Sequence, residues 1–132
     1  MLFRSPSATF LSIECRLTDF RAFANALADS TPGAPTLRTL LGKARDLERS
    51  GLESCRSGDV RATRRALKRT FLKLGRVRAV LGAKRSKTLP GRDQLRADLK
   101  ALRLDVRSLK GNVSCPSDAA ADIGNSLRSP TN

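Results

Sequence analysis

The 132-residue sequence contains no histidine, no tryptophan and no tyrosine. Histidine is the commonest general base near neutral pH and a frequent metal ligand, so the usual group for both kinds of chemistry is missing. No glycine-rich loop precedes a Lys-Ser or Lys-Thr pair. Asp98 and Asp105 lie two turns apart on a predicted helix, and we interpret them as surface charges. The sequence therefore predicts no enzyme, no cofactor and no metal site, unless a partner chain supplies what is missing.

Long apolar runs are also absent. The longest are a few residues, whereas a transmembrane helix needs roughly 20. The first 15 residues are too short and too polar for an ordinary signal peptide. Two locations remain open at this point. Either the protein is cytoplasmic, or the chain is a fragment of a secreted or envelope protein whose export signal lies upstream.

Acidic residues are few compared with basic ones. The chain has 26 Lys and Arg against 12 Asp and Glu, which gives a formal net charge of +14. Residues 57–110 hold 17 of the basic and 4 of the acidic side chains, so the excess is concentrated there. Such a field attracts polyanions, which predicts nucleic acid, acidic polysaccharide, acidic protein or anionic lipid as a partner.

Leu, Ala and Val supply most of the apolar content, and their spacing predicts amphipathic helices. A short first helix is expected over 16–30, and a second over about 36–56 after the break at 31–35, with Thr36 as its N-cap. The apolar side of the first is formed by Leu17, Phe20, Ala24 and Leu27. That of the second is formed by Leu37, Leu41, Ala44, Leu47, Leu52 and Cys55.

A third helix is predicted over about 60–83 and a fourth over about 91–113, with Pro90 in its first turn. Gly58 suits the end of the second helix and Asp59 the N-cap of the third. The apolar side of the third helix is formed by Val60, Thr63, Leu67, Thr70, Leu74, Val77 and Leu81, with Phe71 beside it. The fourth has apolar residues in alternating steps of four and three, typical of coiled-coil a and d positions: Leu95, Leu99, Leu102, Val106, Leu109 and Val113.

These matched lengths and short connections predict an all-α fold, namely a three- to four-helix up-down antiparallel bundle with disordered termini. The predicted division is a loose N-terminal segment at 1–15, a helical bundle domain at 16–115 and a polar, disordered tail at 116–132.

The three cysteines are Cys15, Cys55 and Cys115. In an up-down bundle the ends of the second and fourth helices lie at one pole, which predicts a disulfide between Cys55 and Cys115. It would close a loop of about 60 residues, worth roughly 4 kcal/mol, and would imply an oxidising compartment. Cys15 could approach the same pole, stay free or pair with another chain. The alternatives are three buried free thiols, or a three-thiolate metal site that the lack of His and CxxC disfavours.

Basic side chains occupy the arc of the third helix opposite its apolar side. The predicted anion-binding residues are Arg61, Arg64, Arg65, Lys68, Arg69, Lys73 and Arg76. On the fourth helix, five further bases lie on one flank and two aspartates on the other. The competing interpretation is a solvated face, partly neutralised by Asp98, Asp105 and the acidic residues of the second helix, Asp46, Glu48 and Glu53. No aromatic residues interleave with the bases for stacking, so recognition of a base sequence is not expected.

Several features between Leu37 and about Leu109 form a pattern of their own: a Leu-rich helix, Ser57-Gly58-Asp59, Ala66-Leu67 with Phe71, a basic loop with Leu89 and a last Leu-rich helix. In these features the chain resembles the FIMAH-type helical modules of secreted bacterial multidomain proteins. The spacing of Leu67 to Phe71 and the high Arg content depart from that family's pattern. The resemblance implies an extracellular or envelope interaction module and carries no site residues with it.

Two functions follow as hypotheses. The first is a non-enzymatic basic helical interaction or structural module, secreted or envelope-associated. The second is a sequence-nonspecific nucleic-acid-binding protein that uses the Arg-rich face of the third helix, with an affinity that falls steeply with salt. The state of the cysteines distinguishes the compartments, and the oligomeric state is not predicted.

Overall fold

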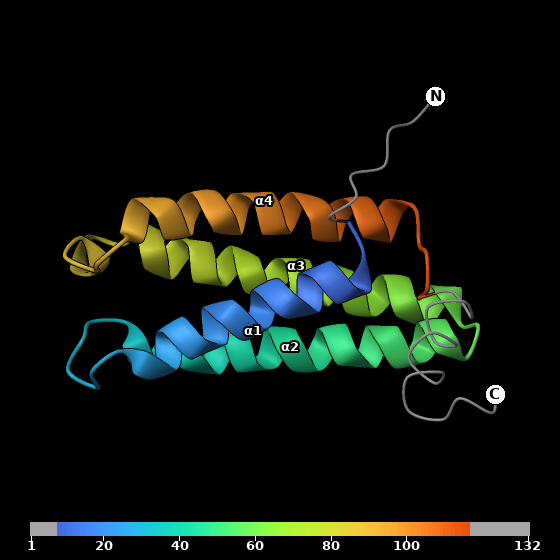
Figure 1. Ribbon diagram of the computed structural model, residues 1–132, viewed down its shortest axis with the longest axis horizontal. Coiled ribbons are helices and arrows are strands. Elements are labelled where there is room, and N and C mark those ends of the chain that lie inside the picture. The colour runs from blue at the N-terminus through green and yellow to red at the C-terminus, as the bar shows by residue number, and fades with distance from the viewer. Residues whose placement is uncertain (1–7, 117–132) are drawn as a thin grey trace, which may run out of the picture.

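The computed structural model describes residues 8–116, and four α-helices make up most of this part of the chain. They are α1 (Phe10–Ala26), α2 (Ala34–Arg56), α3 (Val60–Gly82) and α4 (Arg92–Gly111), with a short 3-10 turn, η1, at Lys84–Ser86. Each α-helix runs antiparallel to the one before it (Figure 1). The predicted all-α up-down bundle is confirmed. Apart from Pro116, the predicted tail lies outside the described residues.

Helix α1 begins at Phe10, six residues before its predicted start. Thr9 is the N-cap, and its side-chain oxygen accepts a hydrogen bond from the Ser12 N–H at 3.1 Å, which satisfies a donor that the first turn leaves unpaired. Phe10 and Ile13 are buried and continue the spacing of Leu17 by steps of three and four. The prediction that 1–15 is loose is therefore wrong for the part that follows Thr9.

Two other helix starts differ from prediction because glycine takes the N-cap. Gly33 has φ +84° and caps α2, which begins at Ala34 and places Pro35 in the first turn, where its missing N–H costs nothing. A Cβ at Gly33 would also lie 3.0 Å from Val80 Cγ1. Gly91 has φ +70° and caps α4, so Pro90 precedes the helix instead of lying in its first turn. The predicted Asp59 cap of α3 is confirmed, because its carboxylate accepts from the Ala62 N–H at 3.0 Å.

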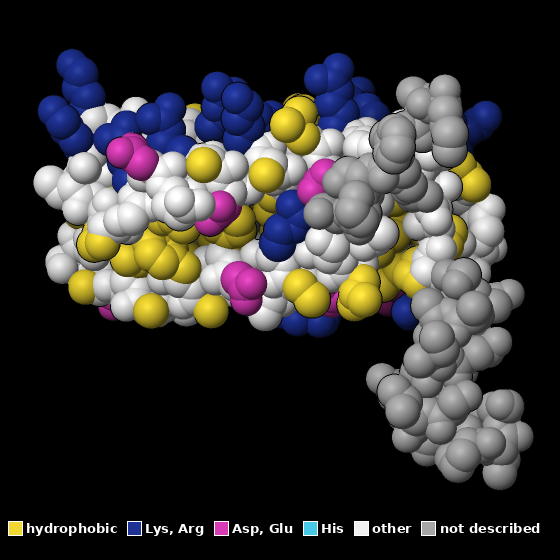
Figure 2. All heavy atoms as spheres, turned by 45° about the horizontal axis from the view of Figure 1, so that its top comes forward, with side chains coloured by type: hydrophobic (Ala, Val, Ile, Leu, Met, Phe, Trp, Pro, Cys, Tyr) yellow, Lys and Arg dark blue, Asp and Glu magenta, His cyan; other side chains and the backbone are white. Residues whose placement is uncertain are grey.

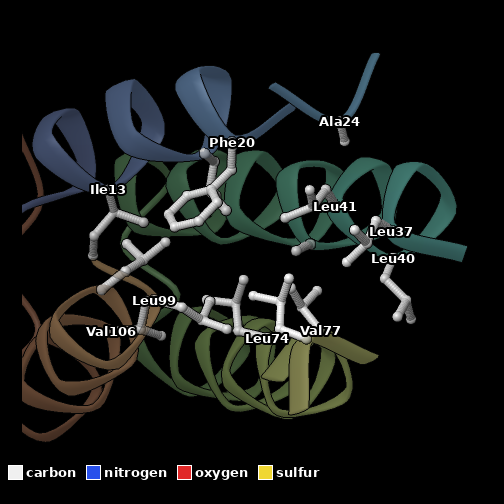
Figure 3. Close-up of a cluster of buried hydrophobic side chains, with 14 of the residues drawn as sticks. Ile13, Phe20, Ala24, Leu37, Leu40, Leu41, Leu74, Val77, Leu99 and Val106 are labelled. Carbon is white, nitrogen blue, oxygen red and sulfur yellow. The ribbon is translucent and has the colours of Figure 1, made fainter. Parts of the chain in front are cut away.

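Buried side chains repeat in steps of three and four along all four helices and meet in one core (Figure 3). On α3 the predicted positions are buried except Val60, which is 46% exposed because it begins the helix at the corner. On α4 the core positions are Leu99, Leu102, Val106 and Leu109. α2 and α3 share the longest interface, while α1 packs mainly on α2 and also touches α4. The core therefore closes around all four helices.

The C-terminal end of α1 is held by a side chain of α2. Arg38 Nε donates to the Ala24 carbonyl at 3.0 Å, and its Nη2 donates to the Leu27 carbonyl. The same guanidinium pairs with Asp29, Nη1 to Oδ1, at 2.6 Å. Carbonyls at a helix end lack partners within the helix. Arg38 supplies them, so this positive charge is used within the fold.

Candidate functional site

Cys55, in the last turn of α2, and Cys115, four residues after α4, meet at one end of the bundle. Their Cα atoms are 5.5 Å apart, within the range for a disulfide, and the structure joins their sulfurs. The predicted pairing geometry is therefore present. Cys15 is exposed and free, so the alternatives that bury all three thiols or bind metal with them do not hold. In residues 8–116 no group of three or more His, Cys, Asp or Glu is placed to hold a metal.

The seven predicted anion-binding residues all lie on the outward side of α3, opposite its buried stripe. We call them the outer basic face: Arg61, Arg64, Arg65, Lys68, Arg69, Lys73 and Arg76. Six are exposed and Lys73 is half-buried. Within residues 8–116 none of the seven forms an ion pair. The charge of Arg76, then partial desolvation and the charge of Lys43, lower the pKa of Lys73, as expected where cations crowd together without carboxylates.

Helix α4 adds a second row of cations. Its members repeat in steps of four and three, one position after the apolar stripe, and we call them the α4 basic row: Arg96, Lys100, Arg103, Arg107 and Lys110. The row lies on the flank next to α3, because Arg103 contacts Phe71 of α3. The opposite flank faces α1, where Asp105 pairs with Arg16 at 2.8 Å. Lys and Arg side chains gather along one edge of the molecule (Figure 2).

Arg103 is the member of the row that packing holds in place. Its guanidinium carbon is 4.2 Å from the ring centroid of Phe71, a cation–π distance. A Cβ at Gly75 would lie 2.9 Å from the Nη2 of Arg103. The guanidinium of Arg103 therefore occupies space that is open only because residue 75 has no side chain. Its Nε is buried and has no hydrogen-bond partner. Burial, and then the charge of Arg78, lower the pKa of Arg103. The guanidinium is thus fixed without being neutralised.

A hollow of about 320 Å³ opens on this side of the molecule. It is lined by Arg78 of α3 and by Asp93, Arg96, Ala97 and Lys100 of α4. Three cations from two helices and one carboxylate therefore face the same space. Arg78 was absent from the predicted site, although its position seven residues after Phe71 places it on the same edge of α3.

A second hollow, of about 200 Å³, lies between α1 and α4 and is lined by Arg16, Asp19, Phe20, Asp98 and Ala101. It has both signs of charge, and Arg16 already pairs with Asp105. This hollow therefore lacks the excess of cations found on the other side of α4.

Glu48 was expected on the surface, but its side chain is fully buried. Neither carboxylate oxygen has a hydrogen-bond partner. Burial, reinforced by Glu14 and opposed by Arg49 and Arg45, raises the pKa of Glu48 from 4.5 to about 7. The neutral acid is the form that this site favours.

The spacing along α2 carries a signal for this burial. The residues at steps of four and three are Leu37, Leu41, Ala44, Glu48, Gly51 and Cys55, and all six are buried. The predicted side used Leu47 and Leu52 instead, and both are half-buried. Gly51 belongs to the stripe because a Cβ there would come within 3.2 Å of Ala66 Cβ.

Comparison with family models, curated proteins and solved structures finds no match to this chain. The resemblance to FIMAH-type modules therefore stays a prediction. None of the helices in residues 8–116 combines the length and apolar character needed to cross a membrane.

Proposed function

We propose that this protein is a non-enzymatic binding module that holds a polyanion on the basic surface formed by the outer basic face and the α4 basic row. One observation carries the proposal. Twelve cations cover two adjacent helices, and in residues 8–116 none of them is paired with a carboxylate. A solvated face that only maintains solubility would not require cations without compensating carboxylates, since mixed charges serve that purpose.

The proposed location is outside the cytosol, secreted or in the cell envelope. It is supported by the placement of Cys55 and Cys115 at disulfide distance, since stable disulfides belong to oxidising compartments. Thiol counting with mass mapping on protein from its native source tests the location. Two blocked cysteines and one free thiol are expected. Three free thiols would favour the cytoplasm.

Sequence-nonspecific binding of nucleic acid is the second candidate, because the same surface suits phosphate. Arg dominates it, and the guanidinium fork matches phosphate, sulfate and carboxylate oxygens alike. The two candidates therefore differ in the polyanion preferred and in compartment rather than in the surface used.

Fluorescence anisotropy with labelled duplex DNA and labelled heparin, at increasing salt, tests both candidates. For DNA, log K is expected to fall linearly with log salt, with a slope of about −0.9 for each phosphate contacted. Replacing Arg61, Arg65, Arg69 and Arg76 with Gln should flatten that slope. An unchanged slope would remove the outer basic face from the site, and no binding of either probe at low salt would contradict the proposal.

A further inference from the structure

We infer that the groove between α3 and α4 binds one strand of a linear acidic polysaccharide, with Arg103 as its fixed anchor. The inference rests on the polyanion binding proposed above, and it adds a site and a ligand class. The groove is the α3-facing flank of α4, which carries the α4 basic row from Arg96 to Lys110 and is hollowed at the end with Arg96 and Lys100. At 1.5 Å per residue the row spans roughly 21 Å. A strand laid along it meets a cation at each step, and Arg78 adds one from the α3 side of the hollow.

Arg103 differs from the side chains of the outer basic face because packing within the fold already restricts its conformation. Its guanidinium lies on Phe71 and fills the space at Gly75. Binding through a long, mobile side chain must order that side chain, and this cost opposes association. Folding has already ordered Arg103, which stays half-buried and therefore still reaches the surface. Phe71 and Gly75 act as positioning residues for this cation.

The ligand class follows from what the groove offers a strand. Single-stranded nucleic acid is usually held by aromatic rings on which the bases stack. The groove has one ring, Phe71, and Arg103 covers it. Phe10 and Phe20 are buried in the core. The remaining interactions are charge-assisted hydrogen bonds to carboxylate or sulfate groups, which an acidic polysaccharide displays at regular intervals. The paired Cys55 and Cys115 suit the extracellular setting in which such polymers occur.

The sharpest test displaces Arg103 without changing the net charge. In Gly75→Ala the new Cβ would sit 2.9 Å from Nη2, and the flexible end of Arg103 has to move away. The matched control is Gly82→Ala on the same helix, where no atom other than the adjacent residues and the helix's own backbone lies within 4 Å of the added carbon. We expect about a fivefold to tenfold weaker affinity of Gly75→Ala for a heparin-derived octasaccharide by calorimetry, and unchanged affinity for Gly82→Ala. Both should stay folded, because alanine favours a helix over glycine. Equal affinity of the two variants would overturn the role of Arg103.

A charge-matched pair locates the strand. The groove variant R96Q/K100Q/R107Q and the outer variant R61Q/R65Q/R69Q each lose three positive charges. We expect the groove variant to bind the octasaccharide at least about tenfold more weakly than the outer variant. Equal losses would overturn the groove site while leaving polyanion binding intact. Failure of the wild type to bind any polyanion would instead contradict the proposed function.

A third arm tests the ligand class. Single-stranded DNA of equal charge is titrated under the same salt conditions as the octasaccharide. Weaker binding of the DNA is expected because the groove has no free ring for stacking. Tighter binding of the DNA that also depends on Arg103 would keep the site and overturn the polysaccharide.

Discussion

The side of the bundle around α1 and the side formed by α3 and α4 treat charge in opposite ways. Around α1 two ion pairs join neighbouring helices: Glu14 with Arg49 at 3.0 Å, and Arg16 with Asp105 at 2.8 Å. On the α3–α4 side the outer basic face and the α4 basic row have no ion pair within the described residues. Arg16 and Arg49 thus join α1 to its neighbours, whereas the cations of the outer basic face and the α4 basic row join no helices through ion pairs. Two features do not fit this comparison, the Cys55–Cys115 pair and the buried Glu48. Each gives a way to test it.

The largest expected effect on stability comes from the Cys55–Cys115 disulfide, which links α2 to the segment after α4. Cys55 belongs to α2, and Cys115 follows α4 across the end of the bundle. Replacing both with Ala should lower the free energy of unfolding by about 4 kcal/mol, because the link closes a 60-residue loop in the unfolded chain. Urea denaturation without reductant measures the difference. Cys15→Ser is the control and should change stability by no more than about 0.5 kcal/mol, since Cys15 is exposed. If reductant leaves the stability of the wild type unchanged, Cys55 and Cys115 are not covalently linked.

Glu48 is buried near α1 without a hydrogen-bond partner for its carboxyl group, and it gives the next largest effect. Its folded-state pKa of about 7 is above the unfolded value of 4.5, so the folded state binds the proton more tightly. The stabilisation is full below about pH 4.5 and is lost as pH rises to 7 and above. The loss should reach roughly 3 kcal/mol. Urea denaturation at several pH values measures it.

Glu48→Gln should remove this pH dependence, because the amide stays neutral throughout. The matched control is Glu53→Gln on the exposed side of α2, which should leave the profile as in the wild type. A profile that is the same for wild type and Glu48→Gln would mean that the buried carboxyl does not titrate over this range.

How much of the core the sequence predicts depends on which residue types occupy the buried positions of each helix. On α3 and α4 apolar residues or Thr fill most a and d positions, so composition and spacing agree and the stripes were predicted. On α2 the same spacing passes through Glu48 and Gly51. Their residue types are not typical of a core, but their positions in the helix face the core. Register determines the outcome, because neighbouring residues of one rigid helix cannot choose their faces independently.

The candidate site divides in the same way. The outer basic face depends only on periodicity within α3, and its placement was predicted. The α4 basic row was visible as a flank, but periodicity does not say which neighbour that flank meets. The packing of α1 on one side of α4 and α3 on the other decides it, as the contacts of Asp105 and Arg103 show. The order of Arg103 depends on the small volume of Gly75, a contact between helices that carries no local signal.

The smallest expected effects are on stability, and they compare the Arg16–Asp105 pair with the unpaired cations of the outer basic face. A double-mutant cycle of Arg16→Gln and Asp105→Asn should give a coupling energy of about 1 kcal/mol or less, because both side chains remain partly exposed. The outer variant R61Q/R65Q/R69Q should leave stability unchanged or raise it slightly, because it relieves repulsion among unpaired cations. Added salt should weaken the coupling on the α1 side, since screening weakens exposed ion pairs. A loss of stability in the outer variant comparable to that of Arg16→Gln would mean that the cations of α3 serve the fold, and they would then no longer be free for a ligand.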